Sequence, residues 1–242
     1  MKIAILADIH GNYDALEAVA LHLNDVDSLV VLGDIVGYGA EPERCVQWVM
    51  KQRADTILGN HDAACVGILP ITWFNSLAAN ALFWTKNQLS VYSQSFFQKI
   101  PQVVSNYVNA HWVHGSLRKP LEEYIDMVES AREIFNSHDF QTCFFGHTHV
   151  AEAFLFHEGK VFNPPFPKGG EIQLHPQKRY LINPGSVGQP RDGNPQASFA
   201  LYDTEKGIVK INRIRYNIQR AADKIIAAGL PEYLSIRLFS GR

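Results

Sequence analysis

The chain has 242 residues, 46% of them hydrophobic and 19% charged, which is enough apolar material to bury a large core. This composition excludes a disordered or fibrous protein. The formal net charge is -2, from 22 Lys and Arg against 24 Asp and Glu, so no overall basic field draws the chain to nucleic acid or to an anionic membrane.

Signals for membrane insertion or secretion are weak. The longest apolar stretches break within about ten residues, fewer than the roughly 18 that a membrane-spanning helix needs. The N-terminus meets Asp8 before the apolar core of a signal peptide can form. The three cysteines are an odd number without a C-x-x-C pair, which does not indicate a disulfide framework. We therefore expect a cytoplasmic protein with no membrane partner.

The N-terminal quarter alternates strand and helix patterns. Apolar runs of strand length occupy residues 2–7, 28–32 and 56–58. Between the first two runs, Leu16, Val19 and Leu23 recur at helical spacing and form one apolar stripe. Pro42 suits the first turn of a second helix that runs to about Gln52. This order predicts parallel strands joined by crossover helices.

The segment from about Thr72 to Lys99 is helical in pattern and rich in aromatic residues, so we expect a helical insertion at about 70–100. Trp73, Phe74, Phe83 and Trp84 stand out in it. Such rings can stack on a base, but packing in the core or against another subunit is the favoured interpretation.

Strand patterns return in the C-terminal half and predict a second, mixed sheet. They occupy residues 103–107, 112–113, 142–145, 180–182, 198–202 and 208–214. A helix is expected near 123–135, and the Pro- and Gly-rich stretch 163–170 indicates an exposed turn or hairpin tip. A last helix begins at Asn217 and stops at Gly229.

Residue types that bind metals recur where apolar runs end. They are Asp8, His10, Asp34, Asn60, His61, Asp62, His114, His147 and His149. Ligands of open α/β sheets bind beyond the carboxyl ends of the strands, so these side chains should meet at one edge. Asp8 with His10, and His147 with His149, are two residues apart, which in an extended chain points both side chains to the same face.

Seven of these residues are more ligands than one tetrahedral ion needs, and two ions that share a carboxylate account for the number. The seven are Asp8, His10, Asp34, Asn60, His114, His147 and His149. Imidazole and carboxylate without thiolate suit manganese, iron, zinc, cobalt or nickel better than calcium. Any one of these residues alone would more often be a turn, a cap or a hydrogen-bonded side chain, and Asp62 can simply cap a helix. Their shared position favours a metal site.

The same segments carry a family resemblance. They are Asp8-Ile9-His10, Gly33-Asp34-Ile35-Val36-Gly37, Gly59-Asn60-His61-Asp62, His114 and Gly146-His147-Thr148-His149. Together they resemble the ordered motifs of calcineurin-like metallophosphoesterases. Residues 114–124 and 183–191 also resemble a prokaryotic branch of this family that is related to diadenosine tetraphosphatase.

The resemblance implies one domain over residues 1–242, folded as a four-layer α/β/β/α sandwich of two mixed sheets with a dinuclear site at one edge. It assigns Asp8, His10 and His149 to one ion, Asn60, His114 and His147 to the other, and Asp34 to a bridge between them. His61 would then be no ligand but the acid near the scissile ester. The alternative is that the His61 side chain only hydrogen-bonds Asp34 or Asp8.

The implied activity is metal-dependent hydrolysis of small phosphomonoesters or phosphodiesters, with nucleotides among the candidate substrates. Val36-Gly37-Tyr38 and Asp62 stand where protein serine/threonine phosphatases carry Asp-Arg-Gly and Glu, so that class is disfavoured. Diadenosine hydrolases also tend to place an Arg after the second motif, and here it is missing. A catalytically silent binding or scaffold protein on the same fold is a further alternative.

Three residues are candidates for contact with the substrate: Arg191, Arg118 and Tyr124. Arg191 follows a Pro-Gly-Ser turn, and its guanidinium can form a forked bond to phosphate oxygens. The alternative is a surface ion pair between Arg191 and Asp192.

Overall fold

The first of two six-stranded sheets has the strand order β3-β2-β1-β11-β12-β9 in the computed structural model, which describes residues 1–105 and 108–242. Its strands are β1 (Lys2–Leu6), β2 (Ser28–Val31), β3 (Asp55–Thr56), β9 (Gly170–Gln173), β11 (Ala197–Asp203) and β12 (Ile208–Ile214). β2 pairs in parallel with both β1 and β3, which confirms the predicted crossover units. The remaining pairs of this sheet are antiparallel.

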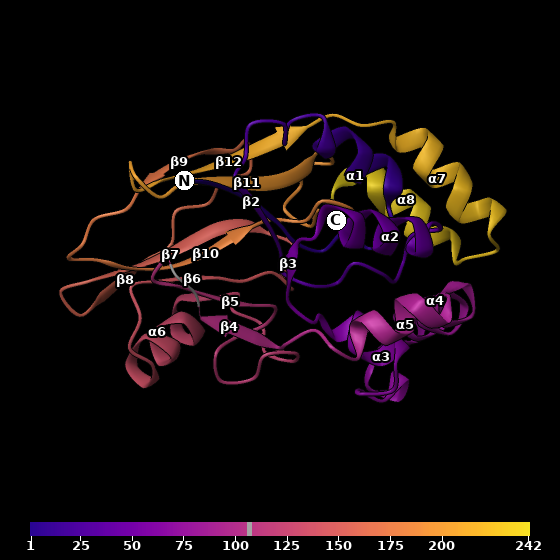
Figure 1. The fold of residues 1–242 in the computed structure, drawn as a ribbon, viewed down its shortest axis with the longest axis horizontal. Coiled ribbons are helices and arrows are strands. Elements are labelled where there is room, and N and C mark those ends of the chain that lie inside the picture. Colours follow the sequence, from indigo (N-terminus) through magenta and orange to yellow (C-terminus); the bar gives the residue numbers. More distant parts are fainter. Residues whose placement is uncertain (106–107) are drawn as a thin grey trace.

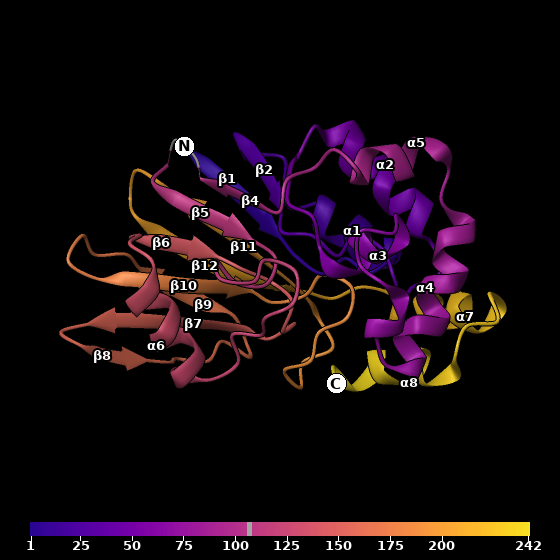
Figure 2. The same cartoon turned by 90° about the horizontal axis from the view of Figure 1, so that it is seen from below.

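The second sheet has the order β4-β5-β6-β10-β7-β8. Its strands are β4 (Val103–Ser105), β5 (Ala110–Val113), β6 (Thr142–Phe144), β7 (Ala151–His157), β8 (Lys160–Phe162) and β10 (Arg179–Pro184). β6 is parallel to β5 and to β10, and Figure 2 shows these three strands pointing toward the half of the molecule that holds most helices. The predicted strand 103–107 begins as β4, and its last two residues, 106 and 107, lie outside the described residues.

Local capping explains where several helices begin. The helices are α1 (Tyr13–Ala20), α2 (Pro42–Gln52), α3 (Asn60–Cys65), the 3-10 helix η1 (Ile71–Trp73), α4 (Ser76–Gln88), α5 (Val91–Phe97), α6 (Val128–Ser137), α7 (Ile218–Ala227) and α8 (Glu232–Ser240). The side chains of Asn12, Asn75, Ser90 and Asn217 each accept a hydrogen bond from the backbone N–H three residues later. α2 instead begins with Pro42 in its first turn, as predicted.

The layers stack in the predicted order α/β/β/α. Alternate residues of β1 face opposite ways: Ile3 and Ile5 pack between the sheets, and Ala4 and Leu6 pack against α1 and α2. α6 covers the outer face of the second sheet, where Ile134 lies in a separate core cluster, and Figure 1 shows α6 below that sheet. The four-layer sandwich of two mixed sheets is therefore confirmed.

A further cluster joins the C-terminal helices to the loop that follows β2. Ala81 of α4, Ile225 of α7 and Leu238 of α8 are buried together with Tyr38. Side chains from the last 25 residues thus reach the edge where the predicted ligands lie. No helix of the described chain is both long and apolar enough to cross a membrane.

Several boundaries differ from the prediction. The segment 72–99 is not one helix, because Ser90 caps a separate α5. The helix expected near 123–135 begins only at Val128, since Glu123 is held in a loop by Ser116 and Arg118. The stretch 163–170 is not a hairpin tip, because the flanking strands β8 and β9 belong to different sheets.

Glu152 on β7 should make stability depend on pH. Its side chain is buried, and burial with nearby Asp126 and Asp192 raises its pKa from 4.5 to about 7, although Asn163 donates a hydrogen bond to it. The folded protein therefore holds a proton that the unfolded chain releases between about pH 4.5 and 7. The free energy of unfolding should fall through this window and stay lower above it.

We expect Glu152→Gln to remove this loss. The measurement is urea unfolding of the metal-free protein at pH 5 and pH 8. Between these pH values, the free energy of unfolding of the variant should rise by on the order of 2 kcal/mol relative to that of the wild type. Parallel pH profiles for the two proteins would show that Glu152 ionises normally.

Candidate metal centre

All seven predicted ligands follow strands, and all are buried. Asp8 and His10 follow β1, Asp34 follows β2, Asn60 begins α3 after β3, His114 follows β5, and His147 and His149 follow β6. Each of these residues has at most 2% of its surface exposed. Charged and polar groups are seldom buried together without a binding role, so their concentration at one edge of the sandwich marks a site.

Five of the predicted ligands have a left-handed backbone. The φ angles are 53° at Asp8, 49° at His10, 53° at Asp34, 68° at His147 and 61° at His149. Positive φ is uncommon outside glycine, and such residues gather at functional sites. The expectation that Asp8 with His10 and His147 with His149 are extended is therefore wrong. Their side chains converge because each loop turns at the ligand itself.

The loops that carry Asp34 and Asn60 touch backbone to backbone. A Cβ atom at Gly33 would lie 2.5 Å from the Gly59 nitrogen, and one at Gly59 would lie 2.1 Å from the Asp34 nitrogen. Only glycine permits this approach, so the two glycines set the distance between the second and third ligand segments.

The ligand atoms form two clusters that share Asp34. Asp8, His10, Asp34 and His149 make the first, and Asp34, His114 and His147 make the second, with ligand atoms within 4.8 Å of one another in each. The Asn60 amide oxygen is 2.9 Å from His114 Nε2 and so adjoins the second cluster. Asp34 Oδ2 lies 3.5 Å from His10 Nε2 and 3.4 Å from His114 Nε2. This division matches the one implied by the motifs.

Backbone carbonyls select the tautomers of three imidazoles. His10 Nδ1 donates to Val36 O (3.0 Å), His114 Nδ1 to Leu32 O (2.8 Å) and His149 Nδ1 to Gln189 O (2.7 Å). A carbonyl can only accept, so each Nδ1 carries a proton, and in the neutral imidazole Nε2 then turns a lone pair toward the clusters. His147 is reversed, with Nδ1 facing the second cluster 3.1 Å from His114 Nε2.

Hydrogen-bond acceptor atoms face one another in the clusters without a donor between them. A bound cation would satisfy these acceptors. Nε2 of His10 and Nε2 of His149 are 3.0 Å apart, although both Nδ1 atoms already hold their protons. Asp34 Oδ2 adds an oxygen acceptor 3.5 Å from His10 Nε2. Nitrogen and oxygen lone pairs that converge in this way suit transition-metal ions, so the residues present fit the implied dinuclear group.

Burial keeps most of the imidazoles neutral. It holds the pKa well below its usual range at three ligands, His10, His147 and His149. Burial opposes the protonation of His114 too, but the neighbouring Asp34 carboxylate outweighs it and raises the His114 pKa to about 9. Burial also raises the pKa of Asp8 to about 7. Neutral imidazole is the form that binds metals, so three of the four histidines are ready ligands.

His61 lies beside the clusters but belongs to neither. Its ring centroid is 4.5 Å from that of Tyr38, 4.8 Å from His10 and 4.9 Å from Phe74. Burial lowers its pKa to about 4, and its buried Nδ1 has no hydrogen-bond partner within the described chain. Its backbone N–H, by contrast, donates to Asp34 Oδ1 at 2.9 Å. The main chain of His61 therefore holds Asp34, while the side chain bonds neither Asp34 nor Asp8.

Asp62 has the capping role that its position allowed. Its carboxylate accepts from the N–H groups of Gly59 (3.2 Å) and Val36 (3.1 Å). It thus caps α3 and ties this helix to the loop after Asp34. Asp62 shapes the centre without being in either cluster.

Arg191 reaches the edge of the centre. Its backbone N–H donates to the carbonyl of His149 at 3.1 Å. Its guanidinium donates to Gln189 Oε1 (3.1 Å) and to the Tyr38 hydroxyl (3.5 Å), and its buried Nε has no partner in the described chain. The alternative pairing with Asp192 is wrong, because Asp192 binds Arg213 instead.

The other two candidates for substrate contact occupy different surroundings. The ring of Tyr124 stacks on His147, with centroids 3.9 Å apart, and 44% of Tyr124 is exposed. Arg118 is engaged by two carboxylates, those of Glu123 and Glu133. These bonds close the loop that carries Tyr124, so the structure places Tyr124 against a ligand and Arg118 in the support of its loop.

The sequence did not single out two residues that shape the centre. Tyr38 contacts both His10 and His61, and its only signal was its place directly after the second motif. Gln189 orients His149 through a backbone carbonyl, for which residue type gives no signal.

The fold is an α/β/β/α sandwich, and one edge of it carries two residue clusters that are able to bind metal. The profile of the calcineurin-like phosphoesterase superfamily domain matches residues 1–207. The chain belongs to this family.

Several known proteins are similar to this chain. A metallophosphoesterase structure from Sphaerobacter thermophilus is 37% identical with a TM-score of 0.89, covering 100% of this chain and 99% of that one. An uncharacterised protein of Methanocaldococcus jannaschii is 36% identical over 99% of this chain and 98% of its own. The symmetrical bis(5'-nucleosyl)-tetraphosphatase of Actinobacillus pleuropneumoniae serotype 5b is 39% identical over only 26% of this chain and 25% of its own.

Proposed function

We propose that the protein is a metal-dependent phosphohydrolase that cleaves small phosphomonoesters or phosphodiesters. Its metal ions would be two divalent transition-metal ions from the group manganese, iron, zinc, cobalt and nickel. Nucleotides are already among the candidate substrates, and the partial match to a bis(5'-nucleosyl)-tetraphosphatase adds dinucleotides to them. The observation that carries the proposal is the pair of buried ligand clusters that share Asp34.

Two divalent ions held there would supply Lewis-acid chemistry, which would neutralise charge on phosphoryl oxygens and lower the pKa of a bound water. Asp8, His10 and His149 would hold one ion, and Asn60, His114 and His147 the other. Asp34 would bridge them, and the His61 backbone N–H keeps its carboxylate in place. The backbone carbonyls on Nδ1 of three histidines keep the ring orientation and tautomer that this role needs.

His61 would supply the proton that the leaving oxygen needs. Because burial lowers its pKa to about 4, this role requires the negative charge of the bound phosphoester to stabilise the protonated imidazole. Its Nδ1 is buried against the loop, since a Cβ at Gly37 would lie 2.4 Å from it, so Nε2 is the atom to hold that proton. The aromatic rings of Tyr38 and Phe74 limit the movement of the imidazole and keep it from water. A positioned histidine of this kind is a usual general acid.

Arg191→Ala should lower kcat/KM by roughly ten- to a hundredfold without changing the metal content. The guanidinium lies at the rim of the centre and has a buried Nε free of protein partners in the described chain, so it can form a charge-assisted bond to a phosphoryl oxygen. Steady-state kinetics with metal analysis in parallel tests this.

Arg191→Lys should recover only part of the loss, because an ammonium cannot reproduce the fork. Arg132→Ala on the exposed side of α6 is the matched control and should leave kinetics unchanged. Unchanged kcat/KM in Arg191→Ala would remove Arg191 from the substrate site.

The proposed activity is tested by stripping the purified protein of metal and reloading it with each of the five candidate ions. The loaded protein is then assayed on phosphomonoesters, phosphodiesters, nucleotides and dinucleotides. We expect turnover only after reloading. Two bound ions without turnover would indicate a catalytically silent binding protein, and preferred turnover of phosphoserine peptides would indicate a protein phosphatase.

A further inference from the structure

Tyr38 lies beside the candidate metal centre in an unfavourable backbone conformation. Its φ angle is 59°, a left-handed conformation that bulky residues rarely adopt. The loop around it is pressed against the site: the Gly39 N–H donates to the carbonyl of His10 at 2.9 Å, and Gly37 leaves no room for a Cβ beside His61. Strain of this kind persists where the surroundings determine the conformation, and it is a reason to ask what Tyr38 does.

The ring of Tyr38 lies between groups that belong to the proposed chemistry. Its centroid is 4.5 Å from the His61 ring at 54° and 4.7 Å from the His10 ring at 58°. The Arg191 Cζ atom is 5.8 Å from the same centroid. One side chain therefore contacts a metal ligand, the proposed acid and the proposed phosphate-binding cation.

The hydroxyl of Tyr38 has one polar partner among the described residues, the Nη2 of Arg191 at 3.5 Å. The second partner of Nη2 is Gln189 Oε1 at 3.1 Å. These two contacts together define the direction of the guanidinium, because a single contact would leave it free to rotate. Tyr38 is only 8% exposed, so it can direct Arg191 while presenting little surface of its own to a substrate.

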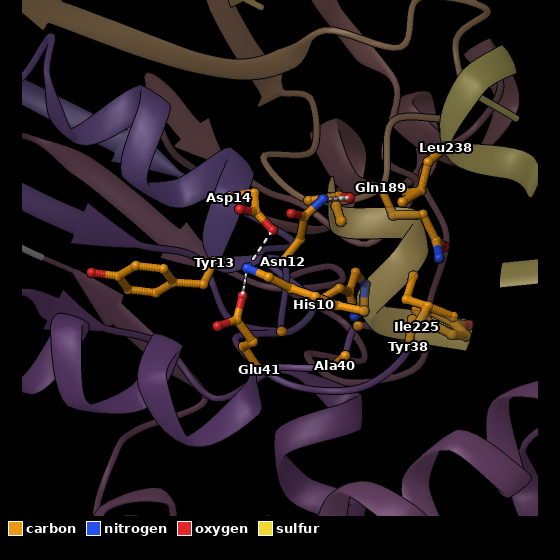
Figure 3. A pocket seen from close by; sticks show the side chains of 15 residues that line it. His10, Asn12, Tyr13, Asp14, Tyr38, Ala40, Glu41, Gln189, Ile225 and Leu238 are labelled. Carbon is orange, nitrogen blue, oxygen red and sulfur yellow. Dashed lines mark hydrogen bonds and ion pairs between the residues drawn. The ribbon is translucent and has the colours of Figure 1, made fainter. Parts of the chain in front are cut away.

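Helices from the end of the chain hold Tyr38 from behind. Figure 3 shows Tyr38 and His10 on the wall of one pocket with Ile225 of α7 and Leu238 of α8. The pocket has a volume of about 10 Å³, which is roughly the space of one water molecule, so the ring has little freedom to move away from the centre. The buried contacts with Ile225, Leu238 and Ala81 complete this support.

We propose that Tyr38 is a positioning residue that aims Arg191 through its hydroxyl and holds His61 through its ring. This inference rests on the proposed phosphohydrolase function for its kinetic consequences, but the Tyr38–Arg191 contact can be tested without turnover. The rival interpretation is that Tyr38 only fills the cluster formed with α4, α7 and α8.

Tyr38→Phe separates the two interpretations, because it keeps the ring and removes the hydroxyl. We expect kcat/KM to fall by about three- to tenfold, mainly through KM, with metal content and thermal stability unchanged. In an Arg191→Ala background, Tyr38→Phe should not lower kcat/KM further, because the guanidinium that the Tyr38 hydroxyl orients is already absent. Tyr202→Phe is the matched control, because Tyr202 is equally buried at 8% exposure but lies between the two sheets.

Tyr38→Leu tests the ring. It keeps an apolar side chain in the cluster but removes the contact with His61, so kcat should fall further. The fall should be about tenfold larger for an alkyl phosphoester than for a nitrophenyl ester, which needs less help from an acid.

An NMR measurement on the metal-free protein gives a readout independent of activity. The Nε–H signal of Arg191, identified by its loss in Arg191→Lys, should shift in Tyr38→Phe and stay in place in Tyr202→Phe. An unmoved signal, or losses that simply add in the double variant, would overturn the proposal and leave Tyr38 a packing residue. If the wild-type protein shows no turnover but the Arg191 signal still shifts in Tyr38→Phe, only the proposed function is contradicted.

Discussion

Replacing Asp34 by asparagine should reduce the metal content from about two ions to less than one per chain and abolish hydrolysis at the same time. Asp34 is the residue common to both clusters, and its Oδ2 faces His10 Nε2 and His114 Nε2. The substitution removes the negative charge and puts N–H donors among converging acceptor atoms. Both ions lose a ligand, so neither cluster should retain its ion well.

The matched control is Asp14→Asn. Asp14 is also buried, at 3% exposure, but its carboxylate binds Arg220 and Lys224 and lies in neither cluster. This variant should lose stability and keep its metal. Elemental analysis and hydrolysis are measured on both variants. At most one ion per chain in the wild type, with activity intact, would contradict the dinuclear centre.

The grouping of the seven predicted ligands at one edge was predictable because each one follows an apolar run, and parallel strands end at a common edge. The local geometry was not. Asp8 and His10 were expected to point the same way on an extended chain, whereas both have positive φ. The pattern of residue types predicts which side chains come together. It does not predict left-handed turns at non-glycine residues, because these depend on the surrounding structure.

Contacts made by the main chain or across long separations leave little trace in a sequence. The carbonyl of Gln189 that orients His149 has no residue-type signature. The contact between Tyr38 and Arg191 joins positions 153 residues apart and follows from tertiary packing. The alternative ion pair between Arg191 and Asp192 was wrong for a related reason. Asp192 pairs with Arg213, which is not its neighbour in the sequence.

Some elements of the fold were missed, among them the seven-residue strand β7. For α8, β8 and β9 the hydrophobic period is weak. α8 buries Leu234 and Leu238, yet 52% of Tyr233 and 56% of Ile236 are exposed, so apolar residues lie on two of its faces. A helix that is apolar on two faces gives no clear stripe. Strands β8 and β9 have three and four residues, too few to show alternation.

His61→Ala should lower kcat by on the order of 10²-fold or more for substrates with a poor leaving group, while the metal content stays at the wild-type level. The structure explains why metal should be retained. His61 is in neither cluster, and its bond to Asp34 comes from the backbone N–H, which alanine preserves. The loss should be smaller for a nitrophenyl ester, because nitrophenolate leaves without a proton.

Added imidazole offers a sharper version of this test. The substitution leaves a space lined by Tyr38 and Phe74 that a free imidazole can enter, so it should restore part of kcat for the poor leaving group. His157→Ala, at the last residue of β7 and in neither cluster, is the control and should behave as wild type. If His61→Ala lost metal, His61 would support the ligands instead, and if it turned over normally, another group would have to protonate the leaving oxygen.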